Sequence, residues 1–327
     1  MGTQTTLVAA TVILFATALA APAGADPVAP PPAVSGGSNY DFYYLDGCYR
    51  QPYQVTAAFD QAPTIIAYQL AGMKRAGQNR LSIGVYHHHG AGDGTAMDST
   101  DGRLPPRGQE NLAGLLADIK QAGFAEVTVV VHPSDGNNPR TWSSWQDALY
   151  EENWQLIQSL HPIIAAAGLP FHLDLGGDLT ASTDESLVLR YDQQLWQAYT
   201  AKFGRADTVG FSIDATDPGQ VLNVGKMYGS TQPSMMDIHS YGDEYSQFVY
   251  TDDRLRQQGF TSQPLIIGEA YYNDKDAAAG FAQGTRRTGR QIYYLTQWPK
   301  TRAGNNECAR VDVAPPTTYA EYAAAGF

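Results

Sequence analysis

The sequence predicts an α/β fold, a (β/α)8 barrel, from three observations. Short strand-like runs alternate with longer amphipathic stretches, so that eight strand-then-helix units follow one another. Several helical stretches end at a glycine just before the next strand, which is the usual left-handed helix stop before a short loop. One cysteine follows the first predicted strand and another follows the eighth, and these two strands are neighbours only in a closed barrel.

The elements follow in order along the chain. The predicted strands are Tyr40–Leu45, Leu81–Tyr86, Val127–His132, Phe171–Leu175, Val209–Ile213, Met235–His239, Leu265–Gly268 and Ile292–Thr296. Helical periodicity between them is clearest in Ala67–Ala76, Gln109–Ala122, Asn153–Ala167, Glu185–Phe203 and Asp276–Thr288.

The residues before the first strand predict an exported protein with a single domain. Residues 1–25 have the pattern of a signal peptide, because Leu7 to Ala21 carries no charge and Ala23-Gly24-Ala25 resembles a cleavage site. No Lys or Arg precedes the apolar run, which departs from the usual pattern, and an uncleaved N-terminal anchor is the alternative. Residues 26–37 form a Pro-rich, then Gly-rich linker, so the catalytic domain is predicted at 38–327. We therefore expect a secreted protein, extracellular or periplasmic.

Composition restricts the partners. The net charge of −12 disfavours nucleic acid and anionic membranes, and it is compatible with a neutral polymer. We expect no nucleic-acid partner, no membrane contact after signal cleavage, no cofactor and a monomer. The two cysteines, Cys48 and Cys308, are expected to form a disulfide in an exported protein, with two free thiols as the alternative.

Polar residues at the strand ends predict a site inside the barrel mouth. Strand alternation directs His172, Asp174 and Asp178 inward from the fourth strand, with His172 a possible partner of Asp174. His132, Asp214 and His239 end the third, fifth and sixth strands. Ordinary barrel interiors are filled by Val, Ile and Leu, so these groups form either a functional site or a structural polar network.

The seventh strand carries the most informative residue. Leu265 to Gly268 is a buried-strand pattern that ends in Glu269, and the carboxyl ends of barrel strands form the active-site mouth. An unpaired carboxylate in such a place is costly, which favours a catalytic group. The aromatic Tyr271 just beyond it is a candidate for stacking on a sugar ring.

With these motifs the chain resembles the clan A glycoside hydrolases, which are retaining (β/α)8 enzymes. Ile266-Ile267-Gly268-Glu269 is similar to the clan's nucleophile strand, and His239-Ser240-Tyr241 resembles its H-x-Y motif. The resemblance implies that Glu269 is the nucleophile, that Tyr241 hydrogen-bonds it, and that His239 and His132 bind substrate. It also implies that Trp298, after the eighth strand, is an aromatic platform under the sugar.

The fourth strand departs from the clan. Gly177-Asp178 stands where the clan has Asn-Glu, so the resemblance carries the acid/base role to Asp178 and leaves no side chain for the Asn. Asp is shorter than Glu by about 1.5 Å. The backbone therefore has to advance Asp178, or the carboxylate gap widens towards inversion, or the protein binds glycan without cleaving it. As an acid, Asp178 would need a pKa raised by its neighbours.

Two further alternatives remain. Asp214, on the fifth strand, is predicted to bind substrate, and as a spare carboxylate it is also a candidate modulator or replacement of Asp178. His87-His88-His89 suggests a metal-dependent hydrolase, although we assign no metal ligand because the remaining strands do not supply the set that such barrels use. The clan's Arg on the second strand also has no counterpart, since Arg80 lies at the strand's start.

Overall fold

The computed structural model describes residues 1–2, 35–44, 50–302 and 316–327. The chain divides into two compact units, Met1–Pro30 and Pro31–Phe327, and the fold below is that of the second. Cys48 and Cys308 lie outside the described residues, as do nearly all of the predicted signal peptide and linker. No helix within the described ranges is long and apolar enough to cross a membrane.

Within the described residues, nine parallel strands form the barrel, in the order β8-β7-β6-β4-β1-β12-β11-β10-β9, and a tenth strand of this sheet, β5 (Met97–Asp98), pairs with β4 off this path. Because β8 and β9 are two halves of one segment, the sheet returns on itself, and the predicted (β/α)8 fold is confirmed. The strands are β1 (Gly37–Asn39), β4 (Arg80–His88), β6 (Glu126–Pro133), β7 (Phe171–Asp174), β8 (Thr208–Gly210), β9 (Ile213–Asp214), β10 (Met236–His239), β11 (Leu265–Glu269) and β12 (Ile292–Gln297).

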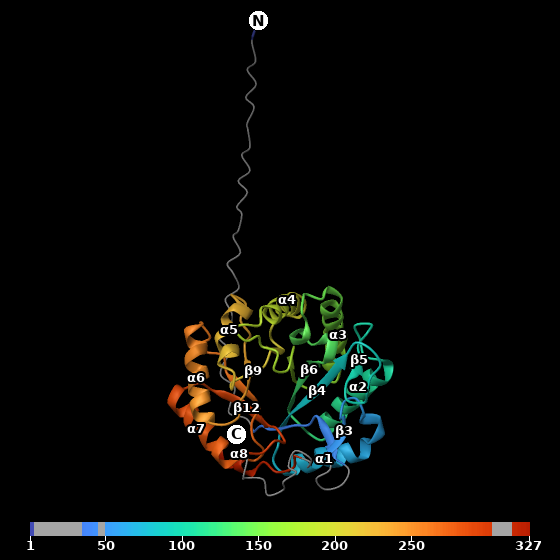
Figure 1. Cartoon of the computed structure of the whole chain (residues 1–327), viewed down its shortest axis with the longest axis vertical. Coiled ribbons are helices and arrows are strands. Elements are labelled where there is room, and N and C mark those ends of the chain that lie inside the picture. The colour runs from blue at the N-terminus through green and yellow to red at the C-terminus, as the bar shows by residue number, and fades with distance from the viewer. Residues whose placement is uncertain (3–34, 45–49, 303–315) are drawn as a thin grey trace. The chain divides into compact units, whose positions relative to one another are not determined.

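Helices follow the strands and surround them (Figure 1). Each buries one face; in α4, for example, Val188, Tyr191 and Leu195 recur at helical spacing and are buried. Proline occupies the first turn of α1, α2 and α5, where its missing N–H costs nothing. The helices are α1 (Pro63–Arg75), α2 (Pro106–Gln121), α3 (Asp147–Ala166), α4 (Ser186–Phe203), α5 (Pro218–Tyr228), α6 (Glu244–Gln257), α7 (Lys275–Thr288) and α8 (Ala320–Ala325).

The prediction for the first strand is wrong. The barrel strand is β1, which pairs with β4 and β12, whereas β2 (Phe42–Tyr44) forms a separate antiparallel pair with β3 (Arg50–Gln54). The backbone packing explains the error: a Cβ on Gly37 would lie 1.8 Å from the carbonyl oxygen of Arg80. Glycine at this position, which suggested a linker, instead permits close contact between strands.

The fifth strand is interrupted between β8 and β9. Gly210 has a φ of 79°, and the hydroxyl of Tyr228 accepts a hydrogen bond from the Phe211 N–H at 2.9 Å. This contact replaces a ladder bond and lets the chain turn out of the sheet. The next residue, Ser212, is thereby placed in the gap, where it contacts the fourth strand's loop.

A buried ionic cluster lies at the N-terminal ends of the strands. Glu126 accepts a hydrogen bond from Arg80 at 3.0 Å and another from the Tyr293 hydroxyl at 3.0 Å. His172 Nε2 lies 2.8 Å from Glu126 Oε1, so His172 pairs with Glu126 and not with Asp174 as predicted. Asp174 instead accepts from the backbone N–H groups of Gly176 and Ser212. This end of a barrel serves stability, so the cluster is structural.

Candidate active site

Asp178, His239 and Glu269 meet at the carboxyl ends of their strands. Asp178 lies on the loop after β7, whereas His239 ends β10 and Glu269 ends β11. The pairing of β10 with β11 places His239 opposite Glu269. His239 Nδ1 lies 2.7 Å from Asp178 Oδ1 and 3.6 Å from Glu269 Oε1. One ligand atom of each residue lies within 4.8 Å of the others. The three residues are called the trio below.

Glu269 has the surroundings that the resemblance implied. The Tyr241 hydroxyl donates to Glu269 Oε2 at 2.7 Å, and the carboxylate side chain is only 15% exposed. Burial, together with the charges of Asp178 and Asp41, raises the pKa of Glu269 to about 7, although the His239 charge and the Tyr241 hydrogen bond oppose the rise. Glu269 therefore takes up a proton near neutral pH.

Asp178 has the opposite electrostatic behaviour. Burial alone would raise the pKa of Asp178. The positive charge of His239 and the hydrogen bond from His239 outweigh burial and lower this pKa to about 2. The expectation that its neighbours raise this pKa is therefore wrong. Its side chain is 50% exposed, and its backbone is left-handed, with a φ of 57°. In the free protein Asp178 is the ionised member of the carboxyl pair.

His239 lies between the two carboxyl groups and is 4% exposed. Burial alone would lower its pKa, but the charges of Glu269, Asp178 and Asp237 raise the pKa of His239 well above the ordinary value. The imidazole is therefore cationic, and it holds a proton 2.7 Å from the carboxylate of Asp178.

His132 contacts the loop that carries Asp178. Its ring stacks on Tyr86, with centroids 4.1 Å apart and planes at 15°, and burial is the main cause that lowers the pKa of His132 to about 4. A Cβ on Gly177 would lie 2.1 Å from His132 Cε1. The neutral His132 ring thus fills the space that a side chain at position 177 would need.

Two residues of this site were missed by the sequence reasoning. The Tyr86 hydroxyl donates to Asp41 Oδ2 at 3.2 Å, and burial raises the pKa of Asp41 to about 6. Asp41 was placed within the wrong first strand, which hid its position at the mouth. Tyr86 ends a predicted strand, and this position alone could have indicated that it lies at the barrel mouth.

The structure does not bring Asp214 into the trio. Its Oδ1 accepts from the N–H of Thr216 at 2.8 Å and from the Thr216 hydroxyl at 2.6 Å, which closes a turn before α5. Its role as a modulator or replacement of Asp178 has no support from these contacts.

The two aromatic candidates are placed differently. Tyr271 packs edge-on against Tyr241 at 5.1 Å, and the Arg302 guanidinium lies 4.4 Å from the centre of its ring. Trp298 follows β12 and is half-buried, and its backbone N–H donates to the Ala270 carbonyl at 2.8 Å. Arg302 thus covers part of the Tyr271 ring, and the roles of Tyr271 and Trp298 in binding a sugar stay predictions.

The three consecutive histidines contact different partners. His87 Nδ1 lies 2.9 Å from the Ser99 hydroxyl, His88 Nδ1 lies 3.1 Å from Asp135, and His89 Nδ1 lies 2.7 Å from Glu152. These contacts hold the loop after β4 in place, and the three imidazole rings do not face a common point. Among the described residues, the group of side chains able to hold a metal ion together is the trio.

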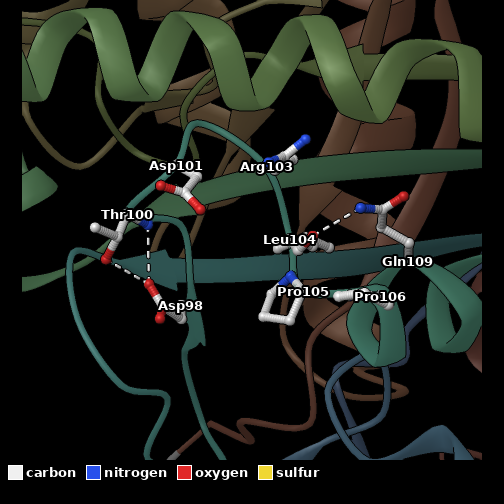
Figure 2. Close-up of a pocket in the computed structure, with 8 residues that line it drawn as sticks. All are labelled: Asp98, Thr100, Asp101, Arg103, Leu104, Pro105, Pro106 and Gln109. Carbon is white, nitrogen blue, oxygen red and sulfur yellow. Dashed lines mark hydrogen bonds between the residues drawn. The ribbon is translucent and has the colours of Figure 1, made fainter.

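The same loop forms a pocket of about 400 Å³ between Asp98 and Gln109 (Figure 2). Asp98 Oδ1 accepts from the backbone and the hydroxyl of Thr100, and the Gln109 amide donates to the Leu104 carbonyl. No residue of the trio lines this pocket, so it is a feature separate from the carboxyl pair.

Comparison with known proteins supports this architecture. No family model matches the chain, and no curated protein matches it. A GH5_18 protein from Bifidobacterium longum subsp. longum, solved with Manb1-4GlcNAc, aligns with 89% of this chain and 77% of its own, at 11% identity and a TM-score of 0.56. An exo-beta-1,4-mannosidase from Opitutaceae bacterium strain TAV5 aligns with 89% of this chain and 59% of its own, at 14% identity and a TM-score of 0.58.

The chain has the fold of the clan A glycoside hydrolases. A GH5_18 structure from Streptomyces cattleya with GlcNAc agrees, with a TM-score of 0.54, 10% identity and coverage of 89% and 80%. At such low identity the likeness concerns the fold. The activity of this chain has to be argued from its own residues.

Proposed function

We propose that this protein is a secreted glycoside hydrolase that cleaves O-glycosidic bonds of an oligosaccharide or polysaccharide with retention. The observation that carries the proposal is the pair of carboxyl groups at the barrel mouth, with oxygens of Asp178 and Glu269 no more than 4.8 Å apart. Inverting enzymes need about 6.5–9.5 Å for a water molecule, whereas retaining enzymes hold the groups about 5–5.5 Å apart. Export rests on the pattern of residues 1–25.

In the first step the ionised Glu269 attacks the anomeric carbon while Asp178 protonates the departing oxygen. The Tyr241 hydrogen bond stabilises Glu269 as an anion. The proton for Asp178 comes from His239 Nδ1, which is 2.7 Å away. Water then hydrolyses the glycosyl-enzyme intermediate, with Asp178 acting as the base. His132, His239 and Trp298 are proposed to contact the sugar.

We propose a β-linked mannoside as the first substrate class to examine. One similar structure is described as an exo-beta-1,4-mannosidase, and others were solved with Manb1-4GlcNAc or GlcNAc. The net charge of −12 fits a neutral glycan better than a polyanionic one.

The test is hydrolysis of a panel of β-mannosides, β-glucosides and their polymers by the purified protein, beside Glu269→Gln and Asp178→Asn. We expect cleavage by the parent, loss in both variants, and products with the anomeric configuration of the substrate. Products of inverted configuration would contradict retention, and activity that survives Glu269→Gln would remove the nucleophile role.

A second candidate is a barrel that binds glycan without cleaving it. The low pKa of Asp178 favours this alternative, because an acid catalyst must carry a proton. Absence of cleavage on the whole panel, with glycan binding by calorimetry that persists in Glu269→Gln, would support it.

A further inference from the structure

We propose that Arg140 and Ser212 are positioning residues for Asp178: they hold its backbone in the left-handed conformation that brings a shortened acid to His239 and Glu269. This inference rests on the proposed function, in which Asp178 is the acid/base. It explains how aspartate can act in a place where the resembling family has the longer glutamate.

The backbone of Asp178 is in an uncommon conformation. Its φ of 57° lies in the left-handed region, which residues with a side chain seldom adopt without support. A residue that returned to the right-handed or extended region would send its side chain in another direction. The position of the carboxylate therefore depends on what holds this one residue.

Both backbone polar groups of Asp178 are held by side chains. Its N–H donates to the Ser212 hydroxyl at 2.8 Å, and its carbonyl accepts from Arg140 Nη1 at 2.5 Å. Arg140 Nη2 also donates to the Thr180 carbonyl at 3.1 Å. Two carbonyls of one turn are thus bound by a single planar guanidinium, which fixes the turn on both sides of Leu179.

Arg140 is itself held in place. Its Nε donates to Glu185 Oε1 at 2.9 Å, and its own N–H donates to the Asn138 side chain at 2.9 Å. The preceding Pro139 restricts the backbone of this short turn. These contacts restrict both the backbone and the side chain of Arg140, so its guanidinium has a defined position beside the Asp178 loop.

Ser212 is fully buried and lies in the interruption between β8 and β9. Its N–H donates to Asp174 Oδ1 at 3.3 Å, and its carbonyl accepts from the Thr180 hydroxyl at 2.8 Å. With its backbone held at both ends, its hydroxyl stays directed at Asp178. The interruption of the fifth strand therefore supplies the hydroxyl group that holds the backbone of Asp178.

The experiment compares Arg140→Lys and Ser212→Ala with the parent, and uses Arg107→Lys as the matched control. Arg107 forms an exposed pair with Asp60 and contacts no residue of the site. Arg140→Lys keeps the positive charge but loses the fork that binds two carbonyls. Because Arg140 is exposed, this variant is expected to fold even if Ser212→Ala does not.

The kinetic readout is the dependence on the leaving group. Misplacing an acid slows glycosides with poorly acidic alcohol leaving groups but spares aryl glycosides whose phenol leaves without protonation. We expect kcat/KM on the alcohol glycosides to fall about 10- to 100-fold in both variants. On the aryl glycosides kcat/KM, which does not include the later step in which Asp178 acts as the base, should change little. Equal losses on both substrate types, or no loss in either variant, would overturn the proposal.

A second readout needs no catalysis: the pKa of Asp178, followed by carbon-13 NMR titration and assigned with Asp178→Asn. We expect Arg140→Lys and Ser212→Ala to raise this pKa towards its ordinary value as the carboxylate leaves His239, and Arg107→Lys to leave it unchanged. An unchanged pKa in both variants would refute positioning. A raised pKa in a protein that cleaves no glycoside would refute the proposed function and leave positioning intact.

Discussion

Nδ1 of His239, a residue only 4% exposed, lies 2.7 Å from the Asp178 carboxylate. His239 is also 3.6 Å from Glu269, so one cation is shared by both carboxyl groups. The closer contact goes to Asp178, which is why the pKa of Asp178 falls while that of Glu269 rises. In the proposed cycle, which begins with Glu269 ionised, the proton of the acid comes from His239.

The first prediction concerns the pH dependence of catalysis. Because Glu269 must be ionised to attack, kcat/KM should rise with pH through about 7. The negative charge of Asp178 contributes to this value, so Asp178→Asn should move the rising limb to lower pH. The profile is measured with an activated aryl glycoside, on which residual activity is expected; a limb that does not move would contradict the coupling.

The second prediction concerns stability. A carboxyl group whose pKa is raised by folding stabilises the native state below its ordinary pKa of 4.5 and loses this contribution as the pH rises through about 7. Glu269→Gln should remove that loss. Between pH 5 and pH 8 the free energy of unfolding of the variant should therefore rise by on the order of 3 kcal/mol relative to that of the parent. Urea unfolding at both pH values measures it; a constant difference would argue against a protonated Glu269.

The third prediction concerns Tyr241. Tyr241→Phe removes the hydroxyl that donates to Glu269 at 2.7 Å, a charge-assisted bond when Glu269 is ionised. Such bonds contribute about 1.5–3 kcal/mol, so kcat/KM should fall about 10- to 100-fold and the rising limb should move to higher pH. Steady-state kinetics against pH provide the check. A limb that moves to lower pH would mean that Tyr241 does not stabilise the anion.

The fourth prediction concerns Gly177. Gly177→Ala places a methyl group 2.1 Å from His132 Cε1, so the ring must leave its stack on Tyr86. We expect a loss of about 1–3 kcal/mol in the free energy of unfolding. His132→Ala in the same chain should recover part of it, because the clash with His132 is then gone and only the contact with Val130 Cγ1 at 2.8 Å remains.

The matched control is Gly136→Ala, where the added methyl group would meet only Leu149 Cδ1 at 3.9 Å. This variant should change stability little. Equal losses at positions 136 and 177 would show that the effect belongs to glycine replacement in general and not to His132.

The fifth prediction concerns the cluster at the opposite end of the barrel. Glu126→Gln leaves Arg80 and His172 without their buried carboxylate, which should cost about 3–5 kcal/mol of stability with kcat unchanged. Asp60→Asn, in the exposed pair with Arg107, should cost about 1 kcal/mol or less. Chemical denaturation compares them, and similar losses would contradict a structural role for the cluster.

Much of the barrel was predictable because strand and helix periodicities are local properties of the chain. The segments around β4, β6, β10, β11 and β12 were found within a few residues, since the apolar residues of each follow a strand pattern that is visible locally. The errors fell where long-range packing overrides local pattern. Gly37 looks like linker until Arg80 is known to lie against it, and β8 and β9 look continuous until the Tyr228 hydroxyl is in place.

The sequence by itself determined the alternation of strands and helices, the carboxylate at the end of β11 and the motif that places Tyr241 beside it. Only the tertiary structure decided that Asp178 is left-handed, that Arg140 and Ser212 contact it, and that His239 lowers its pKa. The reason is physical. Period and residue type act between near neighbours in the chain, whereas hydrogen bonds and pKa values depend on distances between groups that only folding brings together.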